Sequence, residues 1–118
     1  MDQEIIVVTT NNVPGYEVTK VYGEVFGLIV RSRNAFSNFG ASLRTIFGGE
    51  VRGYTKLLAD TRHQAMERLR NEAKAQGANA VLMMRFDSGD IGQQMNEVVA
   101  YGTAVHIKPT SGKPTSGI

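Results

Sequence analysis

The stretch from residue 50 to residue 84, EVRGYTKLLADTRHQAMERLRNEAKAQGANAVLMM, decides the fold of this chain. Its apolar and small residues recur at the spacing of an α-helix and share one side: Tyr54, Leu57, Leu58, Thr61, Ala65, Leu69 and Ala73. Gly77 stands where a left-handed residue ends a helix, and the apolar run Val81–Met84 follows it. The stretch therefore predicts a long amphipathic helix that begins between Glu50 and Tyr54, a glycine stop and a buried strand.

Three other segments have the composition of strands: Glu4–Thr9, Tyr16–Val30 and Glu97–Ile107. Apolar residues at helical spacing between Phe36 and Phe47 predict a short helix, and the composition of Asp87–Asp90 predicts a turn. The order of these elements predicts an α+β domain. It has a β-α-β-β core and an extra N-terminal strand, with the long helix packed on one side of a small antiparallel sheet.

The second half of the long strand, Val25–Val30, is apolar on both of its faces. One helix covers one face of a small sheet, so the other face needs a different cover. Gly23 and Gly27 indicate bulges or the close approach of another backbone. Because association of copies would cover both the open face and the strand edges, we expect a cyclic homo-oligomer.

The length of 118 residues suits one domain, which we place at residues 1–107. Residues 108–118 carry a repeated KPTSG motif and are expected to be a flexible tail. The chain has no cysteine, which excludes disulfides and thiolate metal sites. With no signal-peptide pattern and no apolar run long enough to span a membrane, we expect a cytoplasmic protein. A net charge of +2 is too small to indicate nucleic acid as a partner.

Several motifs occur in an order that resembles the YbjQ-like family: NNVPGY at 11–16, GLIVR at 27–31, GGE at 48–50, GANAV at 77–81 and RFD at 85–87. The resemblance extends from Ile5 to Val105. It implies a dodecin-like β-α-β-β subunit that assembles as a pentameric ring, in a family catalogued as heavy-metal-binding. It implies no established activity and supplies no ligand residues.

The candidate metal ligands are Asp60, His63 and Glu67, which lie at i, i+3 and i+7 on one side of the long helix. Carboxylates and imidazole bind zinc and similar divalent ions. The alternative is an ordinary polar helix face, since such residues are expected there without a ligand. His106 is interpreted as a strand histidine. Asp87–Asp90 could hold two acidic groups for catalysis or a hard cation, although its composition indicates a turn first.

Four arginines flank the predicted short helix and are candidates for binding an anion: Arg31, Arg33, Arg44 and Arg52. No nucleophile elbow, phosphate-binding loop or dinucleotide fingerprint is present. We therefore interpret the chain as a non-enzymatic homo-oligomer that binds a divalent metal ion or a small ligand between subunits. The alternatives are an enzyme of unknown reaction whose active site forms between subunits, and a module that binds anionic ligands.

Overall fold

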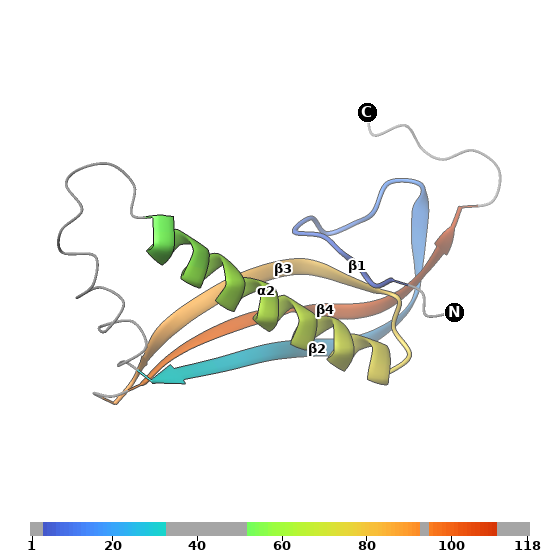
Figure 1. The fold of residues 1–118 in the computed structure, drawn as a ribbon. Coiled ribbons are helices and arrows are strands. Elements are labelled where there is room, and N and C mark those ends of the chain that lie inside the picture. The colour runs from blue at the N-terminus through green and yellow to red at the C-terminus, as the bar shows by residue number, and fades with distance from the viewer. Residues whose placement is uncertain (1–3, 33–51, 93–94, 111–118) are drawn as a thin grey trace.

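The computed structural model describes residues 4–32, 52–92 and 95–110, and these residues form four strands and one helix. The elements are β1 (Ile6–Val7), β2 (Tyr16–Ser32), α2 (Arg52–Ala75), β3 (Ala80–Ile91) and β4 (Met95–Pro109). The strands make one sheet in the order β1-β3-β4-β2, and α2 lies diagonally across one face of it (Figure 1). The predicted α+β class is confirmed. The short helix predicted between Phe36 and Phe47 lies outside the described residues.

Gly77 determines where α2 ends. Gly77 has a φ of 95°, in the left-handed region that glycine adopts without steric cost. Its N–H donates to the carbonyl of Lys74 at 3.0 Å, and the N–H of Ala78 donates to the carbonyl of Ala73 at 3.0 Å. This pair of bonds is the Schellman motif, which satisfies carbonyls that the last helical turn leaves without partners. The predicted glycine stop is confirmed.

The contact between α2 and the sheet combines small residues with a few larger apolar ones. Ala65, Leu69 and Ala73 are fully buried on the helix. The helix-facing side of the sheet presents Val25, Gly27 and Ile29 of β2, with Ala100, Gly102 and Ala104 of β4. A Cβ atom at Gly27 would overlap the carbonyl oxygen of Ala65 and lie 2.5 Å from the amide nitrogen of Leu69. The close backbone approach predicted at Gly27 is therefore present.

The sheet differs from the prediction in three places. It is mixed rather than antiparallel, because the N-terminal strand β1 pairs parallel with β3, and this strand is only two residues long. The predicted turn at Asp87–Asp90 is wrong, since these residues continue β3 and pair with β4 from Val99 to Asn96. Ladder pairing here overrides the turn composition of the segment. Finally, β4 continues to Pro109, which pairs with Tyr16, so the start of the predicted tail belongs to the sheet.

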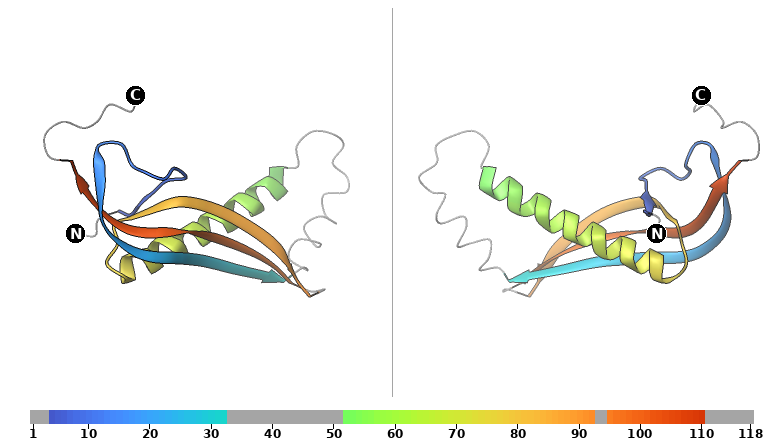
Figure 2. Two further views of the ribbon diagram at one scale, coloured as in Figure 1. Left: turned by 180° about the vertical axis from the view of Figure 1, so that it is seen from behind. Right: turned by 45° about the vertical axis from the view of Figure 1, so that its right-hand side comes forward.

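The other face of the sheet is divided into two halves. At one end, Val8 and Val13 pack on a buried cluster of Ala80, Leu82, Val105 and Ile107. Backbone bonds from Val8 to Val81 and from Met84 to Val8, both 3.0 Å, hold this segment in place. Figure 2 shows the chain between β1 and β2 at that end of the sheet, while α2 lies on the opposite face. The N-terminal segment thus covers one half of the face only.

A Gly27→Ala substitution tests the contact between helix and sheet. We expect it to lower the free energy of unfolding by about 1–3 kcal/mol, because a methyl group at this position has no space unless α2 moves. Urea denaturation at a fixed protein concentration measures the change. Gly89→Ala is the matched control, since no atom lies within 4 Å of a Cβ atom there. Equal stability of the two variants would contradict the assigned contact.

Candidate functional site

An uncovered group of apolar side chains lies on the half of the sheet face that residues 8–13 do not reach. Side chains alternate across a strand, so the residues between the buried positions of β2 point away from α2. Phe26, Leu28 and Val30 are 55%, 42% and 46% exposed. Their partners across the ladder are Tyr101, Val99 and Glu97. We call Phe26, Leu28, Val30, Val99 and Tyr101 the open patch.

Charged residues surround the open patch in an uneven way. Asp87 pairs with Val99 on the β3 side, and Glu97 pairs with Val30. On the β2 side, the guanidinium of Arg68 donates to the carbonyl of Leu28 at 2.7 Å, and that of Arg31 donates to Gln64 Oε1 at 2.9 Å. The β3 border of the patch therefore carries Asp87 next to Arg85, which pairs with Tyr101, whereas the edge of β2 beside α2 carries two arginines.

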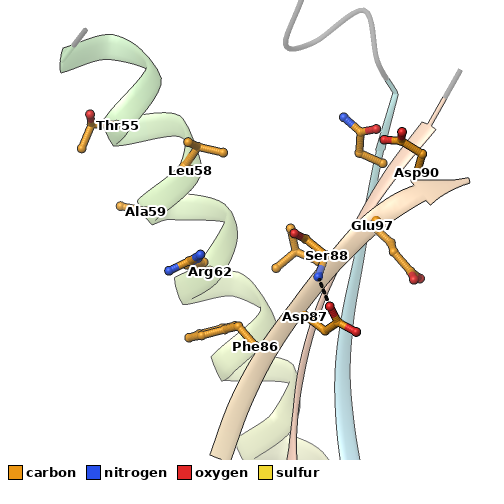
Figure 3. Close-up of a pocket in the computed structure, with 12 residues that line it drawn as sticks. Thr55, Leu58, Ala59, Arg62, Phe86, Asp87, Ser88, Asp90 and Glu97 are labelled. Atoms are coloured by element: carbon orange, nitrogen blue, oxygen red, sulfur yellow. Dashed lines mark hydrogen bonds between the residues drawn. The ribbon is translucent and has the colours of Figure 1, made fainter. Parts of the chain in front are cut away.

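A cavity of about 910 Å³ lies between the first turns of α2 and the far ends of β3 and β4 (Figure 3). Leu58 and Ala59 line it from the helix, and Phe86 and Val98 line it from the strands. Leu58 is 48% exposed, although the helical pattern placed it on the buried stripe. The helix buries Thr61, Ala65, Leu69 and Ala73, but its first turns extend past the part of the sheet that contacts it.

Arg62 carries the charge on the helix side of this cavity. Its guanidinium lies 5.2 Å from the centre of the Phe86 ring, a cation–π contact. Among the described residues, the Arg62 side chain has no hydrogen bond or ion pair. Neither Arg62 nor Phe86 was a predicted site residue. The sequence pattern that could have indicated Arg62 is its i, i+4 spacing from Leu58, which places the two residues on one side of the helix.

The three predicted metal ligands lie on the exposed side of α2. Asp60 forms an ion pair with Lys56 at 2.9 Å, and Glu67 forms one with Arg70 at 3.2 Å. His63 is exposed. In the ranges 4–32, 52–92 and 95–110, no group of three or more His, Asp or Glu side chains is close enough to hold a metal ion. A metal site at these three residues stays a prediction, and it needs further ligands from another copy.

The remaining candidates have separate positions. His106 Nδ1 lies 2.9 Å from Thr19 Oγ1, a contact between neighbouring strands that fits its interpretation as a strand histidine. Asp87 accepts a hydrogen bond from the backbone N–H of Ser88 at 2.9 Å. Of the four arginines proposed to bind an anion, Arg31 contacts Gln64. Arg33 and Arg44 lie outside the described residues, as does the side chain of Arg52, so their grouping stays a prediction.

The described part of the chain contains no helix long and apolar enough to cross a membrane.

Comparison with known proteins gives a consistent family assignment. A family model described as "Putative heavy-metal-binding" (YbjQ) matches residues 5–108. The chain is 57% identical over 106 residues to UPF0145 protein YjfJ of Lactococcus lactis subsp. lactis, which covers 90% of this chain and 97% of that protein. It is 60% identical over 104 residues to a UPF0145 protein of Streptomyces griseus, covering 88% of this chain and 86% of that protein.

Among solved structures, the chain is similar to a protein of unknown function in the DUF74 family from Pediococcus pentosaceus. The sequence identity is 13% and the TM-score is 0.49, with 88% of this chain and 98% of that chain covered.

Proposed function

Because the chain belongs to the YbjQ-like family, we propose that it is a cytoplasmic homo-oligomeric binding protein. Its copies form a ring, a pentamer, and hold a small ligand or a divalent metal ion between subunits. The observation that carries this proposal is the open patch, where Phe26, Leu28 and Val30 are each more than two-fifths exposed. Contiguous apolar surface bordered by polar residues is typical of protein–protein contacts.

The hydrophobic effect supports burial of the open patch. The apolar surface of Phe26 alone is large, and each square ångström removed from water contributes about 25 cal/mol. The chain itself covers the other half of the same face with Val8 and Val13. An association at the patch would therefore continue an existing core, with Tyr101 and Val99 at its centre.

A second copy of this chain is the partner that we propose. The edge of β2 carries Arg68 and Arg31, whereas the β3 side of the patch carries Asp87 next to Arg85. A head-to-tail contact would place the basic edge of one copy near Asp87 of the next. Ring formation needs a contact of this type, between two different surfaces of the same chain. Arg68 also binds the Leu28 carbonyl, which disfavours continuous strand pairing at this edge.

A Phe26→Lys substitution tests the assembly. We expect the ring to dissociate, because the change places a charge within an apolar contact at every subunit boundary. Native mass spectrometry measures the loss of a species with five times the subunit mass of 12.9 kDa. Asn71→Lys adds the same charge on an exposed position of α2 and should leave the ring intact. A wild-type protein that is monomeric at micromolar concentration would overturn the proposal.

The metal part of the proposal has to involve more than one copy. Without cysteine, the chain has no thiolate for a heavy-metal ion, and within the described ranges one copy gathers no set of three ligands. Two of the candidates, Asp60 and Glu67, are engaged in exposed ion pairs, which are weak and exchangeable. The described residues of a single copy supply no group of His, Asp and Glu side chains that fits a heavy-metal site. A metal ion would require Asp60, His63 and Glu67 to meet ligands of a neighbouring copy.

A His63→Gln substitution separates this site from incidental binding. If the metal is held between copies, Zn²⁺ affinity should fall at least about tenfold, because the imidazole ligand is removed. Isothermal titration calorimetry measures the affinity, and His106→Gln serves as the matched histidine control. The dissociated Phe26→Lys variant should also lose the site. Unchanged Zn²⁺ affinity in both His63→Gln and Phe26→Lys would remove Asp60, His63 and Glu67 from consideration.

A further inference from the structure

The cavity beside α2 differs from the open patch because its walls come from one copy of the chain. Phe86 and Val98 have side chains on the helix side of the sheet, since Phe86 pairs with Ala100 and Val98 pairs with Ile29. The open patch uses the alternate residues and faces the other way. The volume of about 910 Å³ is within the range of sites for small organic molecules.

The walls combine apolar surface with one cation. Leu58 and Ala59 lie on one side and Phe86 and Val98 on the other. Figure 3 shows Arg62 on the helix, one turn after Leu58, and Phe86 extending from β3 toward it. The guanidinium is positioned by the Phe86 ring at 5.2 Å, so most of its N–H donors remain available to a bound group.

Of the three acidic residues that line the cavity, Asp87 and Glu97 have side chains on the other face of the sheet, and Asp90 lies near the end of β3, farther along the strand than Phe86 (Figure 3). Asp87 pairs with Val99, which places its side chain on the face of the open patch, and it accepts the Ser88 N–H. In Figure 3 the carboxylates of Asp87 and Glu97 lie on the opposite side of β3 from Arg62. The end of the cavity near α2 is therefore apolar with a positive charge.

We propose that this cavity binds a small organic anion with an apolar body, such as an aromatic monocarboxylate. The carboxylate accepts hydrogen bonds from the Arg62 guanidinium, a charge-assisted contact that favours a planar anionic group. The apolar body lies between Leu58 and Phe86, where it covers helix surface that the sheet does not reach. This inference goes beyond the proposed ring, because the site needs no residue of a second copy.

The test compares 2-naphthoate with its uncharged analogue 2-naphthamide by isothermal titration calorimetry on the full-length chain. We expect wild type to bind 2-naphthoate with a Kd of about 1 mM or tighter. Arg62→Gln should weaken 2-naphthoate at least about tenfold and leave 2-naphthamide unchanged, because only the carboxylate uses the guanidinium. Arg70→Gln is the matched control on the same helix. It should change neither affinity, since Arg70 pairs with Glu67.

Two further variants locate the site. Ala59→Leu fills the cavity from an exposed helical position and should weaken both ligands. Phe26→Lys removes the open patch, so retained binding in that variant shows that ligand and ring are independent. The proposal is overturned if wild type shows no saturable 2-naphthoate binding, if Arg62→Gln binds it as wild type does, or if Ala59→Leu has no effect. A wild-type protein that binds 2-naphthoate but forms no ring would overturn the proposed function alone.

Discussion

At Gly27 the backbone of β2 meets the backbone of α2, and this contact determines the position of the helix on the sheet. The helix can lie so close because Gly27 has no side chain, and Ala65 and Ala73 share one buried cluster with Ala100 and Ala104 of β4. Small side chains place backbones near each other, so the helix is held tightly over its second half. Its first turns continue past this contact, which leaves Leu58 exposed and forms the cavity beside Phe86. One packing constraint thus accounts for the core and for the space next to it.

The two faces of the sheet have different roles. The helix-facing side supplies the core and one wall of the cavity, whereas the opposite side is covered at one end by residues 8–13 and exposes the open patch at the other. Met83 accommodates the N-terminal segment by adopting a φ of 55°, and its N–H donates to the Thr10 carbonyl at 2.9 Å. A left-handed conformation is costly for methionine, so this bond offsets local strain. We accordingly propose assembly and ligand binding on opposite sides of one sheet.

The metal label of the family and the chemistry of this chain differ in an informative way. Heavy-metal ions favour soft ligands such as thiolates, and this chain has no cysteine to supply a thiolate. The candidate residues on α2 are of types that bind a harder divalent ion. Along the exposed face of the helix, however, Asp60 and Glu67 lie apart, each in a separate ion pair. Sequence spacing identifies residues that share a side of a helix. It does not show whether another element or another copy brings a further ligand to them.

The amino-acid sequence by itself determined the local features of this protein. Helical periodicity predicted α2, Gly77 predicted its end, and Gly27 predicted the close approach of another backbone. The tertiary structure decided what depends on partners distant in sequence. Asp87–Asp90 has the composition of a turn but forms a strand, because β4 supplies the hydrogen bonds that a turn would otherwise provide. The pairing of Arg62 with Phe86 likewise required the fold, since only the packing of α2 on the sheet brings these residues together.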